Sequence, residues 1–199
     1  MNLKDVRIGF AVTGSFCTFS KILPAMEQLT AAGAVVQPIF SPATAQEDTR
    51  FFRAEDFAAR VREITGRLIW NTLNEVEPIG PKKALDLLLV APCTGNTLGK
   101  LARGIIDTPV TMAVKSHLRN ARPVVLAVST NDGLSGSAEN LGILLNRKHY
   151  YFVPFGQDDS VNKPNSLVAH MDQIPLACKM ALDGKQMQPM LVPYGGVCH

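Results

Sequence analysis

The sequence predicts a three-layer α/β/α fold of the doubly wound type, in which an open parallel β-sheet lies between two layers of helices. Short apolar runs alternate with helix-like segments along the whole chain, which is the pattern of β-α-β units. Two of these runs, residues 85–91 and 124–128, are apolar on both faces, as strands in the middle of a parallel sheet must be. The chain has 199 residues, of which 46% are hydrophobic and 19% charged, and this is enough for one large domain with its own core.

In the first half of the chain, apolar runs predict strands and a period near 3.6 residues predicts helices. The expected elements are a strand at 6–12, a helix from 18 or 20 to 32, a strand at 35–40 and a helix at 55–65. Gly33 and Gly66 are placed to end the two helices. Pro24 fits a helix only near its first turn, so the first helix is expected to begin later than its apolar pattern suggests. Residues 41–53 are expected to form a long loop.

In the second half, the same reasoning gives a longer series of elements. The expected elements are a short candidate strand at 68–70, strands at 85–91, 124–128 and 150–153, and helices at 96–103, 110–118, 138–148 and 166–182. Residues 1–184 are therefore assigned to a single α/β domain. Residues 185–199 contain two prolines and two glycines and are assigned to a C-terminal tail.

Charge and composition exclude several classes of protein. The net charge is only +3 and the basic residues are scattered, so a nucleic-acid-binding face is not expected. The first residues lack the pattern of a signal peptide, and no window approaches 18 uninterrupted apolar residues. The four cysteines are widely spaced, which argues against a disulfide framework or a zinc site. A cytoplasmic protein that needs no metal is the expectation.

Small polar residues follow four successive strands of the predicted sheet. The segments are Thr13-Gly14-Ser15, Ser41-Pro42-Ala43-Thr44, residues 92–97 (PCTGNT) and residues 129–133 (STNDG). The carboxyl ends of parallel strands share one edge, where ligands bind. Hydroxyl groups and the free N–H groups of helix starts suit an anion such as phosphate. Each segment alone reads as a turn or a helix cap, but the four together predict a phosphate-bearing ligand.

The usual nucleotide motifs do not account for this edge. Gly9 and Gly14 do not form the GxGxxG pattern, and there is no GxxxxGK[ST] loop. The second strand ends at Phe40-Ser41, where an NAD site would place Asp or Glu for the ribose. Direct binding of NAD or ATP through these motifs is therefore disfavoured.

Two segments resemble a known family. GFAVTGSFCT (residues 9–18) is similar to the opening of the flavoprotein family, which includes phosphopantothenoylcysteine decarboxylases and prenyl-flavin synthases and has a Rossmann-like fold. APCTGNT (residues 91–97) and the helix after it resemble that family's Pro-Ala-Ser-Ala-Asn-Thr segment. The resemblance implies FMN, or another phosphate-bearing ligand, at the predicted edge. It also implies a homo-oligomer, a trimer or a multiple of trimers.

A closer resemblance covers most of the chain. EPIGPK (77–82), residues 91–115, residues 119–134 and VPFGQDDSVNKPNSLVAHMD (153–172) are similar to the family of bacterial dipicolinate synthase B subunits. This resemblance implies a partner A subunit that carries NADP, and a joint oxidation of a dihydrodipicolinate-type precursor in the mother cell of a sporulating bacterium. Two alternatives remain open, namely a self-sufficient FMN-binding decarboxylase or oxidoreductase, and a non-catalytic scaffold for the A subunit.

The resemblance also assigns residues to the site. It implies flavin-phosphate contacts from Gly14, Ser15 and Ser41, a lining made by Ala91, Pro92, Thr94, Asn96 and Thr97, and closure of the pocket by Ser129 and Thr130. The decarboxylase branch also uses a histidine after its third strand and a Pro-x-Met-Asn clamp. Residues 48–76 contain no histidine, and the clamp region reads STNDGL, so cysteine decarboxylation is not supported.

The remaining candidates concern the substrate, and the cations that could meet a dicarboxylate are Arg50, Arg53, Lys115, Arg119 and Lys163. For Lys115 and Arg119, which lie on a predicted helix, a solvated surface charge is favoured. Arg50 precedes two phenylalanines in the loop after the second strand, and arginine suits bidentate binding of a carboxylate. A solvated surface charge is an equally open interpretation of Arg50. Asn131 belongs to the polar segment after the fourth long strand and is the second candidate for a dicarboxylate. Asp158 and Asp159 are interpreted as turn and cap residues, and no residue is assigned a catalytic role.

Overall fold

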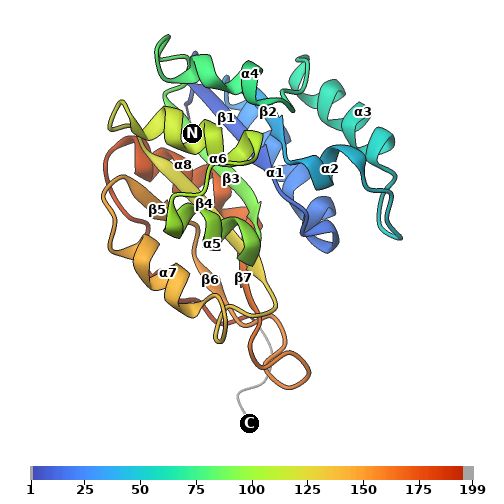
Figure 1. The fold of residues 1–199 in the computed structure, drawn as a ribbon, viewed down its shortest axis with the longest axis vertical. Coiled ribbons are helices and arrows are strands. Elements are labelled where there is room, and N and C mark those ends of the chain that lie inside the picture. Colours follow the sequence, from blue (N-terminus) through green and yellow to red (C-terminus); the bar gives the residue numbers. More distant parts are fainter. Residues whose placement is uncertain (1, 195–199) are drawn as a thin grey trace.

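The computed structural model describes residues 2–194, and these residues form one sheet of seven strands with helices on both faces (Figure 1). The strands are β1 (Arg7–Val12), β2 (Val35–Phe40), β3 (Leu87–Cys93), β4 (Val124–Thr130), β5 (Tyr150–Phe152), β6 (Phe155–Gly156) and β7 (Leu167–Ala169). The α-helices are α1 (Phe19–Ala31), α2 (Pro42–Gln46), α3 (Ala54–Thr65), α4 (Leu73–Val76), α5 (Gly95–Arg103), α6 (Pro109–Leu118), α7 (Ala138–Leu145) and α8 (Ile174–Leu182). Three short 3-10 helices complete this part of the chain, at Phe16–Thr18, Glu77–Ile79 and Met171–Gln173.

The strand order confirms the predicted doubly wound sheet and adds to it. The strands run β2-β1-β3-β4 and are parallel, and β5 continues the parallel sheet beside Val124–Leu126 in the first half of β4. The second half of β4, at Ser129 and Thr130, pairs instead with β7, which is antiparallel and pairs in turn with β6. The sheet is therefore mixed, with two short antiparallel strands placed where β4 ends.

The two faces of the sheet are covered by different helices. Helices α1 and α8 contact each other and pack on one face, while α5, α6 and α7 lie on the other (Figure 1). All seven residues of β3 are buried, and so are the first six of β4. This agrees with the apolar character of both runs, because central parallel strands are covered on both faces.

Three details of the first half differ from expectation. Helix α1 begins at Phe19 and holds Pro24 in its interior, although the proline predicted a later start. Pro24 and Ser20 are not buried, so the Ser20 carbonyl that loses its helical partner can reach water. The expected loop 41–53 contains α2, because Ser41 caps it and a proline occupies its first position. Residues 68–70 form no strand, only a single bridge between Trp70 and Ile39.

The second half departs most at its last expected helix. That helix was predicted for residues 166–182, but α8 begins only at Ile174. Pro175 stands in its first turn, where proline is favoured, and Leu167–Ala169 forms β7 instead. The central strand β3 runs two residues beyond the predicted end at 91. Helix α7 ends at Leu145, earlier than the expected 148.

The last described residues lie against the edge of the sheet. The side chain of Gln186 accepts a hydrogen bond from the N–H of Phe152 at 2.8 Å and donates to the carbonyl of Phe152 at 2.8 Å, as a neighbouring strand would. Further along, Phe155 donates to the Met190 carbonyl and accepts from the N–H of Val192. These contacts cover the free edge of β5 and β6. Among residues 2–194, no helix combines the length and the hydropathy needed to cross a membrane.

Candidate functional site

A cavity of about 780 Å³ opens where β1, β3 and β4 end. Its walls come from the turn after β1, the loop after α2, the start of α5, the segment after β4 and the loop between β6 and β7. The cavity therefore lies at the carboxyl ends of the strands, beside the point where the strand order reverses between β1 and β3. Its volume is within the range of small-molecule sites.

The ends of β1 and β3 are tied together beneath the cavity. The buried hydroxyl of Thr13 donates to the carbonyl of Pro92 at 2.7 Å and accepts from the backbone N–H of Thr94 at 3.1 Å. The Thr94 hydroxyl in turn accepts from the N–H of Thr97 at 3.3 Å and so caps α5. This leaves the N–H groups of Gly95 and Asn96, in the first turn of α5, without a partner inside the helix.

Gly95 is required by close packing at the cavity floor. A Cβ atom at this position would lie 2.6 Å from the Ser137 hydroxyl oxygen, 2.6 Å from the Thr130 hydroxyl oxygen and 2.7 Å from a carboxylate oxygen of Asp132. The Thr130 hydroxyl donates to Asp132. The start of α5 thus meets a hydroxyl group at the end of β4 and a hydroxyl group and a carboxylate from the segment that follows it.

A second hydroxyl pair bridges β1 and β4. The Ser15 and Ser129 hydroxyl oxygens lie 2.8 Å apart, although their residues are 114 positions apart in the chain. Both residues line the cavity, and Ser129 is buried. Hydroxyl groups from three strand ends therefore face one space, and each of them can accept or donate a hydrogen bond to a ligand.

Charged side chains stand on two loops at the rim. Arg50, in the loop after α2, is exposed and lies with its guanidinium carbon 4.8 Å from the ring centre of Phe51. Across the loop from β6 to β7, the Lys163 ammonium forms an ion pair with Asp158 at 3.0 Å, and the Ser166 hydroxyl donates to the same carboxylate at 2.8 Å. Arg50 and Lys163 are the two cationic residues among the described residues that line the cavity.

These contacts shift the ionisation of the pair. Partial burial opposes the charge on Asp158, but hydrogen bonds from Ser166 and Lys163 outweigh it and lower the pKa of the carboxyl group. The hydrogen bond to Asp158 raises the pKa of Lys163. Both groups are therefore charged at neutral pH. Lys163 and Cys17, from the turn after β1, both line the cavity.

The structure brings together most of the residues that the sequence assigns to the site. The predicted residues that line the cavity are Gly14, Ser15, Arg50, Thr94, Asn96, Ser129, Thr130 and Asn131. Four others do not line it: Ser41, Ala91, Pro92 and Thr97. Ser41 is turned to Thr44, whose N–H it accepts as the cap of α2. Thr97 bonds to Thr94, and Ala91 and Pro92 are buried within β3. These four residues hold the backbone around the cavity but do not line it.

Among the lining residues on the loop between β6 and β7, the sequence offered only Lys163, as one of several cations that could meet a dicarboxylate. Asp158, Lys163 and Ser166 reach the cavity because β6 and β7 form an antiparallel pair that holds the loop between them at the end of β4. The available signal was the apolar triplet 167–169 after a polar loop, which is a strand pattern as well as a helical one. Among residues 2–194 there is no cluster of three or more His, Cys, Asp or Glu residues suited to a metal ion.

Comparison with known proteins identifies relatives of this chain. The family described as Flavoprotein matches residues 1–149. The B subunit of dipicolinate synthase from Bacillus subtilis (strain 168) is 44% identical over 191 residues, which are 96% of each chain.

Two solved structures are also similar to this chain. The crystal structure of the B subunit of dipicolinate synthase from Bacillus halodurans is 41% identical, with a TM-score of 0.90 over 97% of this chain and 99% of that one. DmrB of Burkholderia xenovorans, a cubic protein cage for redox transfer solved in complex with FMN, is 18% identical, with a TM-score of 0.67 over 90% and 97% of the two chains. The second likeness concerns the fold alone.

Proposed function

Because this chain belongs to the Flavoprotein family and, within it, to the family of dipicolinate synthase B subunits, we propose that it works with an A subunit to oxidise a dihydrodipicolinate-type precursor to dipicolinate. The match along 96% of both chains is the observation that carries this proposal. The reaction belongs to bacterial sporulation, and we place the protein in the cytoplasm of the mother cell. A homo-oligomer, a trimer or a multiple of trimers, completes the proposal.

The oxidant is assigned to the partner. The carboxyl end of β2 carries Phe40-Ser41, without the acidic residue that a dinucleotide ribose requires, and the turn after β1 lacks the GxGxxG spacing. This chain would then supply the cavity, while NADP is bound by the A subunit.

The residues of the cavity suit a phosphate-bearing ligand such as FMN. The free N–H groups at the start of α5 and the hydroxyls of Ser15, Ser129 and Thr130 are donors of the kind that hold phosphate without a lysine. Gly14 and Asn96 would complete the contacts, with Ser41, Thr94 and Thr97 fixing the surrounding backbone. A bound flavin would supply reversible redox chemistry, and this chain would bind it and shield it from water.

The decisive experiment compares the A subunit alone with the A subunit plus this chain. Dipicolinate formation with NADP⁺ and the dihydro precursor is measured at equal A-subunit concentration. The proposal expects a large gain in rate when this chain is added. Equal rates with and without it would exclude the subunit role.

The cavity itself supports a second candidate, a self-sufficient FMN enzyme, because its hydroxyl groups and free backbone N–H groups suit the phosphate of FMN. The test is the absorbance of the purified chain, with and without added FMN. Tight binding together with turnover of substrate in the absence of the A subunit would favour this candidate, while a colourless chain that does not take up FMN would exclude it.

The third candidate, a scaffold that only stabilises the A subunit, makes an opposite prediction for cavity variants. Ser15→Ala removes a cavity hydroxyl, and its loss leaves the partner Ser129 facing the cavity. Unchanged activity of the complex with Ser15→Ala and with Asn96→Ala would favour the scaffold. A loss of activity with the complex still assembled would favour a working cavity.

A further inference from the structure

The loop of residues 157–166 places three charged or polar side chains on the cavity wall. It joins β6 to β7, and its ends are held by the antiparallel pairing of these strands. The N–H of Leu134 donates to the carbonyl of Asn165 at 3.0 Å, which fixes the loop to the segment after β4. Val161 at the far end of the loop is 85% exposed. The base of the loop is thus well anchored, while its tip meets solvent.

The two members of the Asp158–Lys163 ion pair are held very differently. Asp158 is 22% exposed in its side chain and is bound both by Lys163 and by the hydroxyl of the buried Ser166. The Lys163 side chain is 55% exposed and its ammonium bonds to Asp158. An exposed ion pair of this kind is weak, and a lysine has a flexible four-carbon stem. Lys163 can therefore exchange partners at little cost, whereas Asp158 stays in place.

Arg50 provides the second cation of the cavity, and it comes from a different loop. Its guanidinium lies over the ring of Phe51, which is itself 46% exposed, and no carboxylate of the cavity lining within residues 2–194 holds it there. One cavity therefore has a cation on each of two separate loops. This arrangement matches a ligand with two anionic groups, and arginine is the better of the two for bidentate binding.

We propose that Lys163 is a switchable counter-ion, which pairs with Asp158 in the absence of ligand and with one carboxylate of a bound dicarboxylate, while Arg50 binds the other carboxylate. The choice of a dicarboxylate rests on the proposed function. Asp158 is then a competitor of the ligand for the same ammonium group. Removing its charge should strengthen binding, whereas removing Lys163 should weaken it.

Calorimetric titration of the full chain tests this proposal at low salt. Pyridine-2,6-dicarboxylate is the probe, and pyridine-2-carboxylate, with one carboxylate, is the matched ligand. The variants are Lys163→Met, Asp158→Asn and the double variant. Asp158→Asn keeps an amide oxygen that can accept from Ser166. Lys148→Met, an exposed lysine outside the cavity lining, is the control.

The expected change in affinity for the dicarboxylate has opposite directions in the two single variants. Lys163→Met should bind the dicarboxylate about tenfold more weakly, and Asp158→Asn several-fold more tightly than the wild type. In the double variant the gain from Asp158→Asn should largely disappear, because Lys163 is the group that Asp158 withholds. The monocarboxylate should respond less to Lys163→Met, and Lys148→Met should bind like the wild type.

Several outcomes would overturn the switch. They are a wild-type chain that does not bind the dicarboxylate, a Lys163→Met variant that binds it as well as the wild type, or an Asp158→Asn variant that weakens binding. FMN and inorganic phosphate are titrated in parallel, and an effect of the variants on these ligands alone would assign the cations to phosphate instead. The subunit role is judged separately, by the rate that wild-type chain adds to the A subunit. A gain in rate together with unchanged substrate KM for Lys163→Met would leave that role intact and refute the switch.

Discussion

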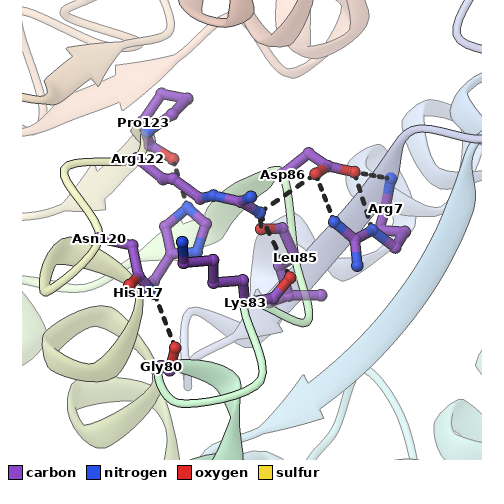
Figure 2. A network of polar contacts seen from close by, with 9 residues as sticks. All are labelled: Arg7, Gly80, Lys83, Leu85, Asp86, His117, Asn120, Arg122 and Pro123. Carbon is purple, nitrogen blue, oxygen red and sulfur yellow. Dashed lines mark hydrogen bonds and ion pairs between the residues drawn. The ribbon is translucent and has the colours of Figure 1, made fainter.

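Asp86 joins Arg7 at the end of the sheet opposite the cavity, and the two residues exchange both backbone and side-chain hydrogen bonds (Figure 2). The carboxylate accepts from the Arg7 backbone N–H at 2.9 Å, from its Nε at 3.0 Å and from its Nη2 at 2.6 Å, while the N–H of Asp86 donates to the Arg7 carbonyl at 2.8 Å. Arg122 adds an ion pair to the same carboxylate at 3.1 Å. These residues begin or precede β1, β3 and β4, so Asp86 ties three strands together.

Replacing Asp86 is expected to destabilise the protein more than replacing Arg7. Asp86→Ala leaves two guanidinium groups near each other and removes the partner of a backbone N–H, which should cost about 2 kcal/mol of unfolding free energy. Arg7→Met should cost about 1 kcal/mol, because the Arg7 side chain is 43% exposed and Arg122 still pairs with the carboxylate. Urea unfolding measures both, with Asp183→Ala, at the end of α8, as control. Equal losses for Asp86→Ala and Asp183→Ala would contradict this role.

His117 lies in the same network and should make stability depend on pH. Its ring is 1% exposed, and Nε2 donates to the Pro123 carbonyl at 3.1 Å. Burial lowers the pKa of His117 from 6.5 to about 4, with smaller opposing contributions from the Pro123 carbonyl and Asp86. Between these two values the unfolded chain binds more protons than the folded one. Stability should therefore fall as pH falls through this window.

The expected loss from His117 is about 2 kcal/mol between about pH 7 and about pH 5. His117→Gln keeps a donor for the Pro123 carbonyl but has no proton to take up, so its stability should vary less over this range. The lowered pKa of Asp86, caused first by its hydrogen bond from Arg7, acts separately. The stability that the charged Asp86 carboxylate contributes is present at neutral pH and is lost only below about pH 4.

His149→Asn is the matched control for this pH test, because asparagine tolerates the positive φ of 69° at that position. Urea midpoints for wild type and both variants at the two pH values decide the matter. A His117→Gln protein with the same pH dependence as the wild type would show that another group causes it.

The predictable part of the fold is the part governed by local pattern. The β3 run is apolar on both faces and could only be a central strand, and Gly66 ends α3 with a φ of 64°, as a C-terminal glycine should. The error at residues 166–173 arose because Leu167–Ala169 is too short for its periodicity to separate helix from strand. Its pairing with Ser129 and Thr130, which are distant in the chain, decided the outcome.

The same distinction holds for the site. Ser15 and Thr94 were identified because polar residues directly follow strands, and parallel strands end at one edge. Ser41 satisfies the same pattern, yet its hydroxyl is used by Thr44 within α2. Lys163 was one of five candidate cations, and the sequence could not single it out, since its position at the cavity depends on the β6–β7 pair, a tertiary contact that no local pattern encodes.

Gly95→Ala should damage the cavity more than the fold. The new Cβ would press on the Thr130 hydroxyl and the Asp132 carboxylate, and these groups would have to shift. We expect at least about tenfold weaker binding of whichever probe the wild type binds, with a loss of about 1–2 kcal/mol in stability. Gly99→Ala in the same helix is the control, because its Cβ would meet the nearest atom at 3.5 Å.

Gly99→Ala should bind normally and gain about 0.5–1 kcal/mol, since alanine restricts the unfolded chain more than glycine does. Titration and urea unfolding of the two variants separate binding from stability. Normal binding by Gly95→Ala would mean that the ligand does not use the floor formed by Thr130 and Asp132.

Cys17 offers a direct report on occupancy of the cavity. It is exposed and lines the cavity, whereas Cys93 and Cys178 are fully buried, and burial raises the pKa of both of these thiols well above the ordinary value. A thiol reagent should therefore label one described cysteine quickly and the other two only after unfolding. Cys198 lies outside the described residues, so the experiment uses a Cys198→Ser background.

Ligand binding should then slow the labelling of Cys17. At a ligand concentration of ten times Kd, about one chain in eleven is free, so the rate should fall about tenfold if the bound ligand covers the thiol. Pyridine-2,6-dicarboxylate and FMN are compared at equal saturation, and labelling of Cys93 in urea serves as the reference for reagent activity. A ligand can bind by calorimetry and yet leave the labelling rate of Cys17 unchanged. Such a ligand must lie away from the turn after β1. Its hydrogen-bond donors would then have to come from the Arg50 and Lys163 side of the cavity or from elsewhere on the chain.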